Sequence, residues 1–267
     1  AQPDLSDAGA ALLAQPADTF NEPVRVDDLT LGCLHRPTAD APTLADAYAF
    51  GCPAPILSLA ESALSPEAVR QRMEALGLLD APALTGFPTV TAPVALPAAE
   101  VSPAAHRALL VGQGALTITP LHLAQIVAAI AHGGNAVSLH LVEAVRPPES
   151  SQWQSPPAAT VRERAMLRAD VAAALENALA YAARISPDTA IAAPPDVPLF
   201  GHSALAFAGP QETPYAWFYG YVRPDETGGE AIVIVVVVEN ERNPAVAARM
   251  ARAAFTAALQ NGEPSAD

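Results

Sequence analysis

The sequence predicts one α/β (α+β) domain over residues 1–267, in which helices flank an antiparallel sheet. Helix-start signals recur through the first two-thirds of the chain, and three strand-like segments joined by short turns follow. A helix led by proline then closes the chain. Helices gathered before a sheet are typical of this fold class. We expect the helical part over about 5–185, and the sheet with its closing helix over about 197–260.

Cap signals place most of the expected helices. A serine or threonine before proline marks a helix start, because the hydroxyl accepts from free backbone N–H groups and proline fits the first helical position. Ser65-Pro66 and Thr119-Pro120 predict helices that end at Gly77 and at Gly133-Gly134. The other expected helices are 7–14, 44–50 capped by Thr43, 54–63, 161–185 capped by Thr160, and one from Asn243-Pro244 to about 260.

The last third of the chain predicts three strands, at 199–207, 215–222 and 231–239, and their short connections favour antiparallel neighbours. Residues 233–238 are apolar at every position, so we expect a central strand covered on both faces. Residues 81–103 predict a long loop with one short strand, 137–145 a strand, and 186–198 a proline-rich connector. Three strands are few for so many helices, and we therefore expect a segment outside this chain to complete the sheet.

Composition excludes several functions. The chain has 28 acidic and 14 basic residues, a net charge of −14, which argues against nucleic acid or an anionic membrane as a partner. Every basic residue is arginine, so no lysine base or lysine Schiff base is available. No apolar run approaches the ~18 residues of a membrane span. The histidines and carboxylates show no metal-ligand spacing, and we expect neither a metal nor another cofactor.

A set of motifs in a fixed order gives the sequence a family resemblance. Gly112-Gln113-Gly114 is followed by Thr119-Pro120-Leu121, an apolar helix and Ala131-His132-Gly133-Gly134. Trp217-Phe218-Tyr219-Gly220-Tyr221 stands on the second expected strand. In this order the motifs resemble those of the penicillin-binding protein transpeptidase domain, over about residues 10–260. The resemblance implies a β-lactamase/transpeptidase-like fold and an extracytoplasmic protein.

The resemblance also implies a cleft lined by three motifs, S-x-x-K with the acylated serine, S-x-N and K-T-G. The S-x-x-K slot falls on residues 1–4 or just before the chain begins, and no Ser-x-x-Lys stands there. The S-x-N slot holds Gly51, Cys52 and Pro53. The K-T-G slot holds His202, Ser203 and Ala204 after Gly201. We therefore expect no catalytic residue on this chain and only a vestigial cleft at these two slots, crowded by the Cβ of Ala204.

Several readings of these residues stay open. His202 is either a cleft residue or an ordinary polar strand residue. A Ser203–His202 dyad is disfavoured because neighbouring strand residues point to opposite faces. Cys33 and Cys52 either form a disulfide, as the implied compartment allows, or are free thiols, of which Cys52 as a nucleophile is disfavoured. Residues 217–221 are expected to serve strand packing.

Three functions follow from the resemblance. The first is a pseudoenzyme with a binding or structural role in peptidoglycan assembly, which forms no covalent β-lactam adduct. The second is an active D,D-transpeptidase or carboxypeptidase whose S-x-x-K serine lies outside this chain. The third is a β-lactam sensor or β-lactamase relative. We expect a cell-wall peptide or another cell-wall assembly protein as partner, and an extracytoplasmic domain tethered through a segment outside this chain.

Overall fold

A computed structural model gives the fold. The residues that it describes are 11–17, 19–20, 22–26, 28–37, 40–81, 84–85, 102–114, 117–137, 139–140, 144–154, 165–209, 212–224 and 230–261. The helices are α2 (Leu44–Ala49), α3 (Pro53–Ala63), α4 (Pro66–Ala75), α5 (Pro103–Leu110), α6 (Pro120–Ala131), α7 (Ala169–Ile185), α8 (Pro187–Ala190) and α9 (Pro244–Asn261). The strands are β1 (Val24–Val26), β2 (Leu29–Leu31), β3 (Leu84–Thr85), β4 (Leu139–His140), β5 (Leu199–Ala208), β6 (Thr213–Val222) and β7 (Ile232–Glu239).

The main sheet is antiparallel, in the order β5-β6-β7. Its register sets His202 opposite Tyr219 and Ser203 opposite Phe218. The expected α/β (α+β) class, with an antiparallel sheet flanked by helices, is confirmed. The central position expected for the valine-rich strand is wrong, because among the described strands β6 is central and β7 lies at the edge.

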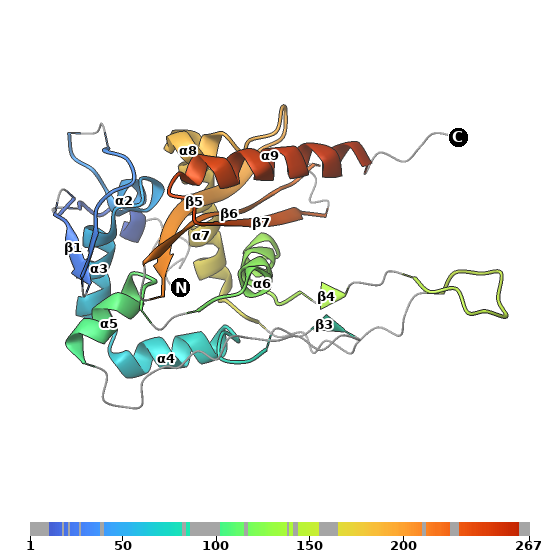
Figure 1. Cartoon of the computed structure of the whole chain (residues 1–267), viewed down its shortest axis with the longest axis horizontal. Helices are drawn as coiled ribbons and strands as arrows, with labels where there is room; N and C mark the ends of the chain where they lie inside the picture. The colour runs from blue at the N-terminus through green and yellow to red at the C-terminus, as the bar shows by residue number, and fades with distance from the viewer. Residues whose placement is uncertain are drawn as a thin grey trace, which may run out of the picture.

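Helices cover both faces of this sheet, as Figure 1 shows: α8 and α9 lie on one face, α6 and α7 on the other. Alternate β7 residues such as Ile234 pack with α9 around Phe255, which is fully buried. Val233, on the opposite face, packs with α6 around Val127 and Ile130. The valine-rich strand is therefore apolar at every position because two helices cover it, although it is an edge strand.

Four of the predicted cap residues begin their helices. Thr43 forms a capping box with Asp46 at α2, and the hydroxyls of Ser65 and Thr119 accept from backbone N–H groups at α4 and α6. At α9 the Asn243 side chain accepts from the N–H of Ala245. These local signals act within one turn of the chain, which explains why the sequence reveals them.

The helix expected over 161–185 begins later, at Ala169, and Thr160 lies outside the described residues. The N–H groups of Met166 and Leu167 donate to the carbonyl of Gly134, which holds this stretch in a non-helical path. A Cβ at Gly134 would clash with the carbonyl oxygen of Leu167, so this crossing requires glycine. The turn that ends α6 thus also delays α7.

Three more elements depart from the expectations. The hairpin of β1 and β2, over residues 24–31, was not among the expected elements, and the connector 186–198 includes α8. The helix α5 follows Ser102-Pro103, the same signal that predicted α4, and was not expected. Of the expected helix 7–14, residues 11–13 are helical and 7–10 lie outside the described residues. Of the expected strand 137–145, Leu139–His140 form β4, and residues 138 and 141–143 lie outside the described residues.

Candidate functional site

The residues assigned to the K-T-G slot lie on β5, where aromatic side chains enclose His202. His202 is 5% exposed, and its ring stacks on Tyr48 of α2 with the centroids 4.3 Å apart. Tyr219 of β6 meets the same ring edge-on at 5.6 Å. The hydroxyl oxygens of Tyr48 and Tyr219 are 3.0 Å apart and share a hydrogen bond. The side chain of His202 is thus enclosed between two rings.

This environment keeps His202 uncharged. Burial lowers the pKa of His202 to about 4, because the imidazolium would lose its hydration. Its Nδ1 is buried and has no hydrogen-bond partner among the described residues. Burial also raises the pKa of Tyr48 well above its usual value, so that hydroxyl stays protonated. At neutral pH the described side chains at this slot therefore supply no positive charge to hold a carboxylate.

The other residues of the slot serve the sheet. Ser203 lies opposite Phe218, on the face away from His202, and its buried hydroxyl has no partner among the described residues. Gly201 is required by packing, because a Cβ there would come within 2.9 Å of the Phe218 ring. Ala204 lies opposite Trp217. The structure therefore separates Ser203 from His202, and a dyad of the two is not formed.

The residues assigned to the S-x-N slot lie at the N-terminus of α3 and carry neither a hydroxyl nor a side-chain amide. Gly51 has a φ of +61°, and a Cβ there would come within 2.9 Å of the Leu34 side chain. Cys52 is the N-cap of α3, and Pro53 occupies the first helical position. Cys33 and Cys52 form a disulfide, so Cys52 offers no free thiol. Backbone geometry and packing thus both disfavour a serine at residue 51.

A series of contacts connects the two slots. The disulfide fixes the segment that holds His35, whose Nε2 donates to Asp188 Oδ2 at 2.8 Å. The next residue of α8, Thr189, accepts at Oγ1 from the N–H of Ser203 at 3.0 Å. The S-x-N slot is thereby linked through α8 to the outer edge of β5.

The outer edge of β5 is occupied at two places. The N–H of Ser203 donates to Thr189, and the N–H of Phe207 donates to Gln113 Oε1 at 3.2 Å. By strand alternation the N–H of Leu205 points to the same edge. Side chains therefore already satisfy the groups on either side of Leu205, which shortens the edge available to an added strand.

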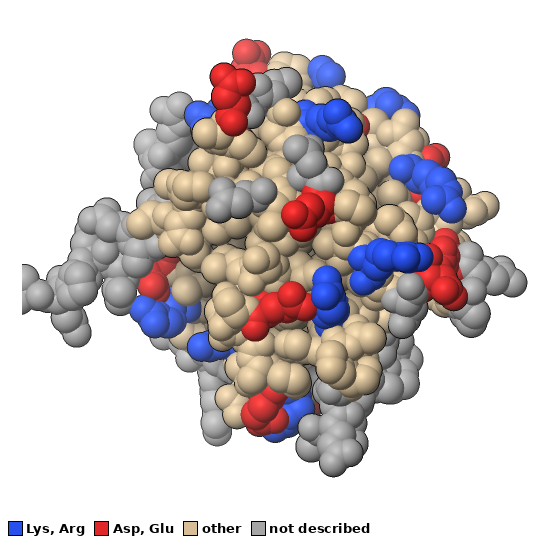
Figure 2. Space-filling view, turned by 90° about the vertical axis from the view of Figure 1, so that its left-hand side faces the viewer, with Lys and Arg blue, Asp and Glu red and all other residues tan. Residues whose placement is uncertain are grey.

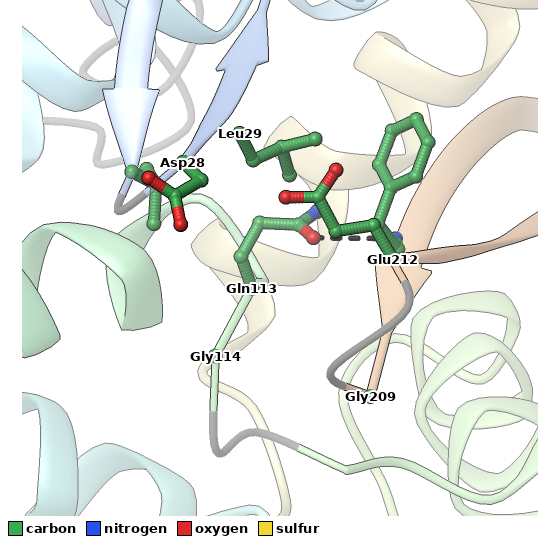
Figure 3. A pocket seen from close by; sticks show the side chains of 8 residues that line it. Asp28, Leu29, Gln113, Gly114, Gly209 and Glu212 are labelled. Atoms are coloured by element: carbon green, nitrogen blue, oxygen red, sulfur yellow. Dashed lines mark hydrogen bonds between the residues drawn. The ribbon is translucent and has the colours of Figure 1, made fainter.

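A separate pocket of about 300 Å³ lies where three turns meet. The hairpin of β1 and β2, the Gly112-Gln113-Gly114 turn and the hairpin of β5 and β6 line it, as Figure 3 shows. Gln113 is 5% exposed and fixes the last two of these segments through its bond to Phe207. Asp28 and Glu212 bring carboxylates to this pocket.

The surface near these features has a mixed charge. Figure 2 shows acidic and basic side chains interspersed over the left-hand side of Figure 1, where β1, α3 and α5 lie, with wide uncharged areas between them. The net charge of −14 is therefore not gathered into one continuous acidic patch among the described residues of this face.

The sequence assigned residues to the slots only by resemblance, and it did not reveal most of the residues that surround them. Tyr48, Leu34 and Thr189 gave no signal, because each acts through a contact with a distant segment. Tyr219 was expected only to pack, and Gln113 only to mark the resemblance. The S-x-x-K slot at residues 1–4 lies outside the described residues. Among those described, no helix has the length and apolar character of a membrane span.

Comparison with known proteins agrees with this architecture. The sequence model of the family "Penicillin binding protein transpeptidase domain" matches residues 33–181, more than half of the chain. The chain is 27% identical over 157 residues to the peptidoglycan D,D-transpeptidase PbpA of Mycolicibacterium smegmatis, a match that covers 57% of this chain and 31% of that protein.

Solved structures show the same fold. The crystal structure of PBPA from Mycobacterium tuberculosis superposes with a TM-score of 0.76 and 24% identity, over 96% of this chain and 59% of that one. The imipenem acyl-enzyme complex of penicillin-binding protein A from M. tuberculosis gives a TM-score of 0.75, also at 24% identity, over 96% and 58%. This chain thus spans less than two-thirds of the length of each relative.

Proposed function

Because the chain belongs to the family of penicillin-binding protein transpeptidase domains, we propose that it acts in peptidoglycan assembly as a binding or structural domain and forms no acyl-enzyme. The observation that supports this most is the aromatic cluster of Tyr48, His202 and Tyr219 in the K-T-G slot. The side chain that replaces the family's lysine is enclosed and uncharged there.

Acyl transfer needs a nucleophile, a base beside it and donors for the oxyanion. The S-x-N slot offers neither a nucleophile nor a base. Gly51 has no side chain, the sulfur of Cys52 is in a disulfide, and Pro53 has no side-chain amide. The chain also has no lysine to serve as the base. Both internal slots are changed, and a missing upstream segment would not account for either.

A second function is favoured by one observation, which is that this chain spans only part of the length of its relatives. The chain spans 59% of the M. tuberculosis PBPA chain, and a Ser-x-x-Lys on a segment outside this sequence would supply a nucleophile and a lysine. This reading makes the protein an active D,D-transpeptidase or carboxypeptidase. It leaves Gly51 and the buried His202 without a catalytic role.

The partner and location belong to the same proposal. The family and the disulfide suit an extracytoplasmic domain, tethered through a segment outside this chain. A cell-wall peptide or another cell-wall assembly protein is the partner that this setting favours.

Intact-protein mass spectrometry after incubation with a penicillin tests the proposal, on the 267-residue chain and on the complete reading frame that encodes it. We expect no added mass on either, with heat-unfolded protein as the control for non-specific acylation. One adduct on the complete protein alone would establish the second function. An adduct on the 267-residue chain would overturn the argument from the slots, and peptide mapping would name the residue. Turnover of a chromogenic cephalosporin would instead indicate a β-lactamase.

A further inference from the structure

We propose that the Cys33–Cys52 disulfide is a redox-sensitive switch that sets how firmly helix α8 holds the outer edge of β5. The switch acts through the contacts that connect the disulfide with His35, α8 and Ser203. This inference goes beyond the proposed function, because it applies equally to a binding domain and to an active transpeptidase.

The disulfide attaches the segment that carries His35 to the N-terminus of α3. Cys33 precedes His35 by two positions, and Cys52 is the N-cap of α3. The backbone hydrogen bonds that accompany the disulfide are weaker, because the N–H groups of Leu34 and His35 share a single carbonyl, that of Phe50, at 3.1 and 3.3 Å. Reduction therefore removes the covalent cross-link that fixes the position of His35.

Carbonyl oxygens already lie beside both sulfur atoms. Cys33 Sγ is 3.3 Å from the carbonyl oxygen of Phe20, and Cys52 Sγ is 3.9 Å from that of Phe50. A thiol donates a weak hydrogen bond to such an oxygen, whereas a disulfide sulfur has no proton to donate. The surroundings therefore accommodate the reduced thiols as well as the disulfide.

His35 transmits the state of the disulfide to α8. Its Nε2 donates to Asp188 Oδ2 at 2.8 Å, and Asp188 is 8% exposed. No other described side chain forms a hydrogen bond or ion pair with this carboxylate. A buried carboxylate that loses its partner is costly. We therefore expect α8 to shift and expose Asp188 to water when His35 moves away.

The helix α8 carries the shift to β5. Asp188 and Thr189 are neighbours in this four-residue helix. Thr189 is fully buried, and its Oγ1 accepts from the N–H of Ser203 at 3.0 Å. A shift of α8 therefore weakens the hold on Ser203. On the same edge of β5, the N–H of Phe207 donates instead to Gln113, which takes no part in this series of contacts.

An external dithiol operates the switch by thiol–disulfide exchange. Its thiolate attacks the sulfur of Cys33, which is partly exposed, whereas Cys52 is 2% exposed. Cys52 leaves as a thiolate that takes up a proton. The second thiolate of the dithiol then displaces Cys33 from the mixed disulfide. The two cysteines gain two electrons and two protons, and the dithiol loses them as it becomes a disulfide.

Amide hydrogen exchange on the full chain tests the proposal, followed by 15N-HSQC with and without dithiothreitol. The mass gain of two hydrogen atoms verifies complete reduction. We expect the exchange of the Ser203 N–H to become about tenfold faster on reduction, because its local opening loses about one hydrogen bond. The exchange of the Phe207 N–H should change by less than about twofold. Cys33→Ser/Cys52→Ser should show the fast Ser203 exchange in both conditions.

His35→Ala, with the disulfide intact, tests the contact with α8 separately. Ser203 should exchange in this variant as fast as in the reduced parent, and dithiothreitol should add nothing. His132→Ala, which removes an exposed histidine at the end of α6, should keep the parent's response.

Three results would overturn the proposal. Equal acceleration of Ser203 and Phe207 on reduction would mean a general loss of stability. Unchanged Ser203 exchange in the fully reduced parent would mean that α8 does not respond to the disulfide. Unchanged Ser203 exchange in His35→Ala would mean that His35 does not transmit its state. If the reduced parent unfolds, the His35→Ala result decides alone.

Discussion

Acidification should destabilise this protein in a way that depends on one histidine. The pKa of His202 is lowered by burial from its ordinary 6.5 to about 4. Between these values the unfolded chain binds the proton and the folded protein does not, so stability is fully present above pH 6.5 and falls as the pH drops toward 4. From pH 7 to pH 4.5 this linkage amounts to about 2 kcal/mol of unfolding free energy.

Urea unfolding at pH 7 and at pH 4.5 measures this loss, and His202→Phe isolates it. The phenyl ring keeps the stacking on Tyr48 but cannot titrate, so the variant should lose about 2 kcal/mol less than the parent over the same interval. Titration of carboxylates is common to both proteins and cancels. Tyr48→Phe, which keeps the ring and removes the hydroxyl, should retain the parent's pH dependence.

Two results would refute this reasoning. One is an equal loss of stability in the parent and in His202→Phe. The other is an NMR titration of the His202 ring with a midpoint near 6.5, which would mean that the ring is open to water. If His202→Phe does not fold, the NMR titration of the parent decides alone.

Three further predictions concern stability. Gly51→Ser should lower the free energy of unfolding in urea by about 2–3 kcal/mol, because the serine would strain a left-handed backbone and its Cβ would clash with Leu34. The variant should also form no penicillin adduct. An adduct on it would contradict the pseudoenzyme proposal. Reduction of Cys33–Cys52, which closes a separation of 19 residues, should lower the free energy of unfolding by about 3 kcal/mol, with the Cys33→Ser/Cys52→Ser double variant insensitive to reductant. Arg223→Met should lower the free energy of unfolding by about 1–3 kcal/mol, since Arg223 donates two hydrogen bonds to Glu176. If Glu176→Gln lowers it by as much, the whole loss comes from the Arg223–Glu176 pair.

Local signals explain what could be predicted. Caps such as Thr43 and Thr119 act on backbone groups within one turn, so their helices follow from the sequence. The strands β6 and β7 follow from aromatic and β-branched runs, and β5 from an apolar stretch, with glycine-containing turns between them. The same reasoning placed the start of α7 too early, because the N–H groups of Met166 and Leu167 donate to the carbonyl of Gly134 and the helix begins only at Ala169.

In the candidate site, too, some features follow from the sequence and others only from the fold. The sequence by itself determined that no lysine is present and that the order of motifs resembles the transpeptidase family. The assignment of residues to the motif slots follows from that resemblance and stays a prediction. Those facts concern residue identity and spacing along the chain. The pairing of Cys33 with Cys52 was one of two open readings, and the fold decides it.

Only the tertiary structure decided that His202 is enclosed by Tyr48 and Tyr219, and that Gln113, Asp28 and Glu212 line one pocket. These contacts join residues far apart in the chain, such as Tyr48 and Tyr219, which are 171 positions apart. Burial and electrostatics depend on all neighbours in space, so the charge state of His202 cannot be read from its place in a motif. The fold, and not the residue type, makes this histidine neutral.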